Sequence, residues 1–152
     1  MTQRKPRRGY FTSAVNCRCP RCREGKLFVN GVSISMKKNL QMNPHCKVCN
    51  QPTELEVGFY YGTSYVSYAL TVFLSVVSLV LWGLTIGISV NDNSVFYWLG
   101  VNAVLLIFLQ PWLMRLSRGL WISWFVKYDP DWQEHQPEDV SERLNKDQAN
   151  NW

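Results

Sequence analysis

The apolar residues of this chain are gathered into two long runs that carry almost no charge. Between Val57 and Met114, Asp92 is the only acidic or basic residue. The run over residues 65–90 is long enough, at about 1.5 Å per helical residue, to cross a hydrocarbon core of about 30 Å. A second run over residues 95–114 follows the turn-forming residues 91–94. We therefore expect two antiparallel transmembrane helices joined by a short outside loop.

Basic and aromatic side chains alternate over residues 115–128, directly after the second run. This composition predicts an interfacial helix at the level of the lipid headgroups, with its cationic side chains on phosphate. Pro111 precedes it and cannot donate a backbone hydrogen bond, so we expect the helix to bend there. The expected interfacial anchors are Trp112, Arg115, Arg118, Trp121, Trp124 and Lys127.

Small residues recur mostly at intervals of four along the first apolar run, and such a face lets another helix approach closely. The partner is either the second run, through Gly100 and Ala103, or a helix of another protein. Asn102 is strongly polar, so we expect it to face protein rather than acyl chains. The predicted helix-packing face consists of Ser67, Thr71, Ser75, Gly83 and Gly87.

The polar segments that flank the apolar runs differ in charge. Residues 1–64 hold eleven Lys and Arg against three Asp and Glu, whereas residues 128–152 hold two against seven. The loop between the runs has no Lys or Arg, so the positive-inside rule predicts that both termini are cytoplasmic. The expected polar segments are a basic flexible lead (1–16), a cysteine module (17–52), a connector (53–64) and an acidic tail (129–152).

Four of the five cysteines form two C-x-x-C pairs that are separated by 23 residues. This spacing is close to that of a zinc ribbon, in which two turns place four thiolates around one ion. A closed tetrathiolate has no open coordination position, so one structural zinc is expected, with iron as the alternative metal. Asn30 and Gly31 between apolar pairs predict a tight hairpin. The predicted ligands are Cys19, Cys22, Cys46 and Cys49.

Other residues of the module allow further roles. Cys17 and His45 could act as an extra ligand or as neighbours of the ligands, although a bystander thiol and an exposed ring are the simpler interpretations. A cluster of basic residues could bind nucleic acid or a ribosome, but topology and anionic lipid headgroups are the preferred explanation of basic residues beside a membrane. The acidic tail could also fold back on this cluster. The basic patch consists of Arg7, Arg8, Arg18, Arg21, Arg23 and Lys26.

Three blocks of sequence resemble the bacterial family known as domain of unknown function 983, over residues 17–128. The blocks are CPRCREGKLF at residues 19–28, HCKVCNQPTELEVGFYYGTSYVSYALTV at residues 45–72 and PWLMRLSRGLWISWFVKYDP at residues 111–130. The resemblance implies a small protein of the bacterial inner membrane with a zinc-ribbon-like head and two spans. The family's usual glycine after each C-x-x-C pair is Arg23 and Asn50 here.

These observations predict an integral membrane α-helical hairpin of two transmembrane helices with a small N-terminal zinc-ribbon-like β module. No nucleophile motif, phosphate-binding loop or intramembrane carboxylate indicates an enzyme. The expected function is a non-catalytic zinc-binding accessory protein, as a subunit or assembly factor of a larger inner-membrane complex. The alternatives are a membrane-tethered ribosome- or nucleic-acid-binding zinc ribbon and a rubredoxin-like electron carrier.

Overall fold

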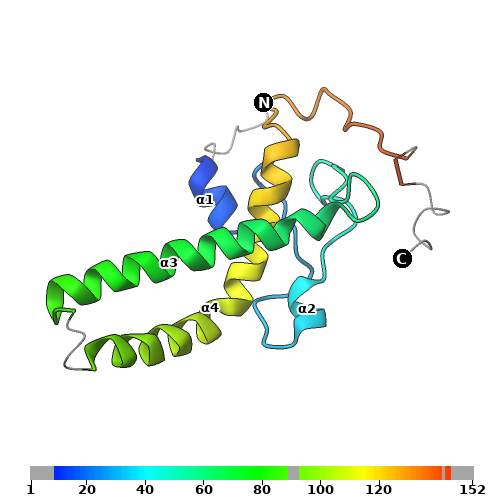
Figure 1. Cartoon of the computed structure of the whole chain (residues 1–152). Coiled ribbons are helices and arrows are strands. Elements are labelled where there is room, and N and C mark those ends of the chain that lie inside the picture. The colour runs from blue at the N-terminus through cyan, green and yellow to red at the C-terminus, as the bar shows by residue number, and fades with distance from the viewer. Residues whose placement is uncertain (1–8, 89–92, 142, 145–152) are drawn as a thin grey trace.

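The computed structural model describes residues 9–88, 93–141 and 143–144. Two helices in this part of the chain are long and apolar enough to cross a membrane. They lie side by side and antiparallel, as Figure 1 shows, and carry the smaller segments at one end. In chain order the elements are α1 (Tyr10–Val15), α2 (Met36–Leu40), the 3-10 helix η1 (Phe59–Gly62), α3 (Thr63–Thr85) and α4 (Ser94–Phe125).

Polar side chains join α3 to α4 within the hairpin. Ser78 donates a hydrogen bond to Asn102 Oδ1 over 3.0 Å, and Asn102 Nδ2 donates to Ser75 Oγ over 3.2 Å. Trp98 Nε1 donates to Ser78 Oγ over 3.1 Å. Asn102 is buried, as expected for an amide that would otherwise meet lipid. Ser75 therefore faces the protein's own second helix.

The glycine end of the predicted packing face takes no part in this contact. α3 ends at Thr85, earlier than predicted, and Gly87 follows it with a φ of +89°, a conformation that glycine adopts without strain. A Cβ on Gly83 would meet the side chain of Ile88, and one on Gly100 would meet no atom within 4 Å. Of the two partners that the sequence left open, the structure therefore does not show a contact of these glycines across the hairpin. Within the predicted face, Ser67, Thr71, Ser75 and Gly83 are half-buried, whereas Gly87 is exposed.

α4 runs without a break through the predicted boundary at residue 114, but it is not straight. Figure 1 shows that its yellow second half turns sharply away from its first half, in the region where Pro111 lies inside the helix. The ring of Pro111 removes one backbone hydrogen bond, which allows the bend. Half of the predicted outside loop, residues 91 and 92, lies beyond the described residues, and Asn93 precedes α4 in a left-handed conformation.

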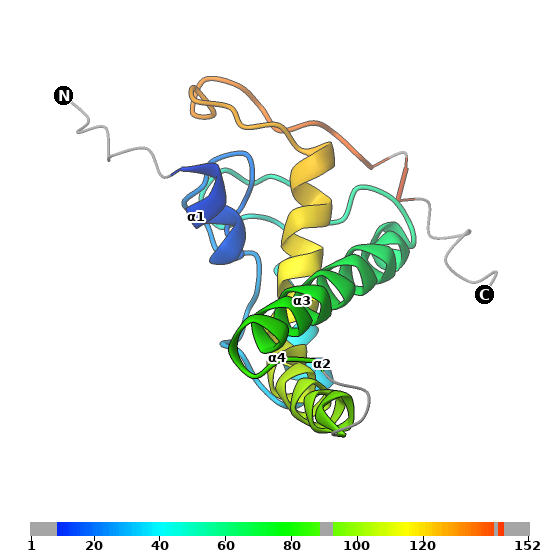
Figure 2. The ribbon, with the colours of Figure 1, turned by 60° about the vertical axis from the view of Figure 1, so that its left-hand side comes forward.

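The segment before η1, residues 9–58, is called the head here. It is assembled around the second half of α4, and Figure 2 shows α1, the rest of the head and the tail gathered there. α1 lies within the segment predicted to be a flexible lead, so that prediction is wrong for residues 10–15. Ser13 and Ala14 are buried, and a Cβ on Gly119 of α4 would lie 3.6 Å from the carbonyl oxygen of Ala14. Packing against α4 accounts for a helix in this short segment.

No strand occurs among the described residues, so the predicted β module is not confirmed. The head contains isolated β-bridges instead, which pair Arg18 with Lys26, Phe28 with Met42 and His45 with Pro52. The hairpin expected at Asn30 and Gly31 is wrong, because residue 28 pairs with residue 42 and α2 lies between them. Buried Asn39 of α2 donates a hydrogen bond to the carbonyl of Pro111 over 2.8 Å, which holds this segment against α4.

Candidate metal centre

Two similar turns present the four cysteines of the C-x-x-C pairs. In the first, the N–H of Arg23 donates to the carbonyl of Cys19 over 2.8 Å, and in the second the N–H of Asn50 donates to that of Cys46 over 2.9 Å. Arg23 and Asn50 both adopt left-handed conformations, with φ of 58° and 56°. These are the positions where the family resemblance led us to expect glycine. The backbone therefore keeps the turn at both sites without it.

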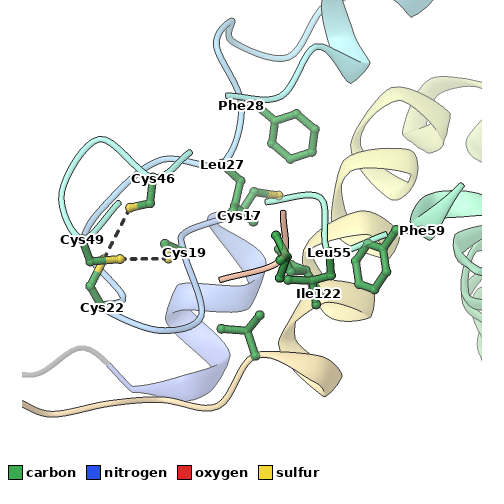
Figure 3. Packing of buried hydrophobic residues seen from close by; sticks show 12 residues of the cluster. Cys17, Cys19, Cys22, Leu27, Phe28, Cys46, Cys49, Leu55, Phe59 and Ile122 are labelled. Atoms are coloured by element: carbon green, nitrogen blue, oxygen red, sulfur yellow. Dashed lines mark hydrogen bonds between the residues drawn. The ribbon is translucent and has the colours of Figure 1, made fainter. Parts of the chain in front are cut away.

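The four sulfur atoms converge on one point, as Figure 3 shows. Cys19 Sγ lies 3.7 Å from Cys49 Sγ, and Cys22 Sγ lies 3.7 Å from Cys46 Sγ. All four sulfurs are within 4.8 Å of one another, and all four residues are buried. A tetrahedron with metal–sulfur bonds of about 2.3 Å has sulfur–sulfur edges of about 3.8 Å. The arrangement therefore fits a tetrathiolate metal site.

The four thiols shift one another's pKa values in opposite directions: those of Cys22 and Cys46 are lowered, and those of Cys19 and Cys49 are raised. A hydrogen bond with Cys19, its largest influence, lowers the pKa of Cys22 to about 7, and the same neighbour lowers the pKa of Cys46 below its ordinary range. Hydrogen bonds with Cys22 and the other thiols raise the pKa of Cys19. The N–H of Gly25 also points at Cys22 Sγ, with a donor–acceptor distance of 3.5 Å. Four thiolates at this spacing require a cation, because their charges otherwise repel one another.

Gly25 leaves the space that the sulfur of Cys46 occupies. A Cβ at this position would lie 2.2 Å from Cys46 Sγ, far inside van der Waals contact. The sequence indicated a turn here, but nothing in its spacing indicated that the missing side chain admits a ligand from the other turn.

Neither of the two predicted extra ligands belongs to the cluster. Cys17 is buried against α4, and a Cβ on Gly119 would lie 3.8 Å from its sulfur, which points away from the other four in Figure 3. Burial raises the pKa of Cys17 above its ordinary value, so its thiol is neutral at neutral pH. The side chain of His45 is exposed. In the part of the chain that the structure describes, the only group of three or more metal-binding side chains is the four-cysteine cluster.

The predicted basic patch is largely engaged by the protein itself. Arg21 is buried, and its Nη2 donates to the carbonyl of His135 over 2.7 Å and lies 3.4 Å from Asp129 Oδ2. The guanidinium of Arg23 lies 3.8 Å from the centre of the Tyr128 ring. The acidic tail thus folds back on the patch. Arg18 is half-buried, Lys26 is exposed, and Arg7 and Arg8 lie outside the described residues.

Three of the predicted interfacial anchors donate hydrogen bonds to backbone carbonyls of the protein itself. Arg115 is buried, and its Nη2 donates to the carbonyl of Asn30 over 2.8 Å. Arg118 Nη1 donates to the carbonyl of Leu40 over 3.0 Å, and Trp121 Nε1 donates to the carbonyl of Phe59 in η1 over 2.8 Å. The buried guanidinium of Arg115 is therefore used within the protein, whereas contact of the half-buried Arg118 with lipid phosphate stays a prediction. Of the other predicted anchors, Trp112 is half-buried, whereas Trp124 and Lys127 are exposed.

One family model, described as "Protein of unknown function (DUF983)", matches residues 36–125. The matched region contains both long helices and the second cysteine pair, Cys46 and Cys49, whereas the first pair precedes it. No curated protein and no solved structure matches the chain.

Proposed function

Because the chain belongs to the DUF983 family, whose function is unknown, we propose a function from the site itself: a non-catalytic, zinc-binding accessory protein of a larger membrane complex. The observation that carries this proposal is the closed cluster of four buried sulfurs, 3.7 Å apart in pairs. A metal held by four protein thiolates has no position left for a substrate or an activated water. Its contribution is therefore to hold the head together.

Zinc suits this role because it has no redox chemistry and accepts four thiolates in a tetrahedron. The head lacks a regular sheet among its described residues and shares its buried core with α4, so the binding free energy of the ion would add to the stability which that shared core supplies. All five cysteines are free thiols, which supports a reducing compartment for the head. We accordingly place the head and both termini in the cytoplasm of a bacterial cell, at the inner membrane.

An exposed aromatic surface at the end of α4 is where we place the partner. Trp124 is 62% exposed and Tyr61 is 74% exposed, although both lie beside a packed aromatic cluster. Within that cluster the rings of Phe59 and Phe125 are 5.1 Å apart, and those of Trp121 and Trp124 are 5.9 Å apart. An exposed tryptophan that packs against a buried aromatic cluster is typical of the residues that dominate protein interfaces.

The proposal is tested by purifying the tagged full chain from native membranes in a mild detergent, followed by mass spectrometry and metal analysis. We expect one zinc per chain and a reproducible set of membrane proteins with the wild type. The Trp124→Ala variant is expected to keep the zinc and to lose the partners. Tyr97→Ala, at an exposed aromatic position near the other end of the hairpin, is the matched control. A monodisperse protein without partners in several detergents contradicts the accessory role.

An electron carrier of the rubredoxin type is the second candidate, because iron and zinc fit the same four sulfurs equally well. Metal analysis separates the two at once, since an iron tetrathiolate is coloured and a zinc site is colourless. Nucleic-acid binding has less support, because Arg21 is buried and Arg23 lies over the Tyr128 ring. Steeply salt-dependent RNA binding by the full chain would restore that alternative.

A further inference from the structure

An exposed apolar segment follows Phe28, which forms a β-bridge with Met42, and reaches the start of α2. Ile34 is 92% exposed, Val32 is 61% exposed and Met36 at the start of α2 is 53% exposed. Single exposed apolar residues are common, but neighbouring ones of this size on one short segment indicate a contact surface. We refer to residues 29–36 as the apolar loop; its last residue, Met36, is also the first residue of α2.

The backbone of the apolar loop and the segment that follows it are tied to the bend of α4. Arg115 donates to the carbonyl of Asn30 over 2.8 Å, and Asn39 donates to the carbonyl of Pro111 over 2.8 Å. Asn39 is fully buried. Both views show α2 beside the bent part of α4 (Figures 1 and 2). The position of the loop along the membrane normal is therefore set by the position of Pro111.

The length of α4 before its bend places Pro111 at the inner edge of the hydrocarbon region. From Ser94 to Gln110 the helix advances about 25 Å, at about 1.5 Å per residue. The hydrocarbon core of a bilayer is about 30 Å thick. A helix that begins at the outer boundary thus reaches Pro111 before it has left the inner leaflet, and the apolar loop is held at that depth.

We propose that the apolar loop enters the inner leaflet of the bilayer, so that the head is itself a membrane-inserted module. Val32 and Ile34 then contact the upper parts of the acyl chains. Lys37 and Lys38 follow directly and are exposed, so their ammonium groups reach the phosphates of anionic lipids. Apolar tips next to basic residues are the combination found in segments that lie in the membrane interface. This inference does not depend on the proposed partner complex.

The test measures the depth of position 34 in the purified full chain, one copy per nanodisc of phosphatidylcholine and phosphatidylglycerol. A nitroxide amino acid replaces Ile34, and its collision rates with oxygen, which prefers lipid, and with a water-soluble nickel complex are compared. Labels at Phe108, an exposed residue of α4, and at Asp131, an exposed residue of the tail, give the lipid and water references. Each labelled protein is first checked for its bound metal.

We expect the ratio of oxygen to nickel collisions at position 34 to resemble that at position 108 and to exceed that at position 131 several-fold. A ratio equal to that at position 131 overturns the proposal. Because each nanodisc holds a single copy and no other protein, protection from nickel there cannot come from a partner. Protection in native membranes that disappears in the nanodiscs assigns the loop to a protein contact instead, and likewise overturns the lipid assignment.

Discussion

Replacing Gly25 with alanine tests the geometry of the metal centre most directly. The added Cβ would lie 2.2 Å from Cys46 Sγ and 3.5 Å from Val48 Cγ2. Normal contacts need about 3.5 Å or more, so the sulfur must move by more than about 1 Å. A metal site tolerates changes in ligand distance of about 0.2 Å. The turn cannot absorb the whole shift. An overpacking cost of about 3 kcal/mol corresponds to roughly 100-fold weaker metal binding.

The assay is competition of the purified full chain with a chromophoric chelator, together with metal content after purification. Gly31→Ala is the matched control, because a Cβ at Gly31 would meet no atom within 4 Å. We expect the control to bind metal as the wild type does, and Gly25→Ala to lose metal to the chelator at far lower concentrations. Equal affinities of Gly25→Ala and the wild type would show that Cys46 does not occupy the position described.

Three further substitutions or conditions probe the junctions around this centre. In Gly62→Ala the new Cβ would lie 2.2 Å from Cζ2 of Trp121, so we expect a loss of about 1–3 kcal/mol of stability and a shift of tryptophan fluorescence. Asn102→Leu removes the two hydrogen bonds of Asn102 to α3 and is expected to lower the stability of the hairpin by about 1 kcal/mol, measured by unfolding in detergent. An unchanged stability would refute this expectation. Burial alone would raise the pKa of Asp129, but hydrogen bonds, first that with His135, hold it below its ordinary value. A depressed folded-state pKa means that the tail contact is complete at neutral pH and is lost as the pH falls below about 4, which limited proteolysis of the tail should detect.

The features that could be predicted from the sequence are those that short-range patterns determine. Two apolar runs are enough to predict two helices that could span a membrane, because a long helix satisfies its own backbone hydrogen bonds in lipid. The spacing of Cys19, Cys22, Cys46 and Cys49 is enough to predict that they meet, because each C-x-x-C turn forms locally. The bend at Pro111 follows from the missing N–H of a single residue.

The features that could not be predicted depend on contacts between distant parts of the chain. Arg115 and the carbonyl of Asn30 are 85 residues apart, and arginine next to a span fits lipid phosphate as well as a loop carbonyl. α1 is helical because Ser13 and Ala14 are buried against α4, not because its own composition favours a helix. The predicted hairpin at Gly31 failed for the same reason, since Asn39 is held by Pro111.

The head and the hairpin of α3 and α4 share one buried core, and this decides how a bound metal would act on the whole protein. Figure 3 shows the cysteines in a single cluster with Leu27, Phe59 and Ile122, which come from the head, from η1 and from α4. Val140 of the tail belongs to the same cluster. A fragment that ends before α3 would lack Ile122 and Val140 and would expose apolar surface that α4 covers. A metal at the cysteine cluster would hold together the segments that enclose the second half of α4, so its binding free energy would also fix the direction that α4 takes after Pro111. The cluster would thus support α4 rather than a separate domain.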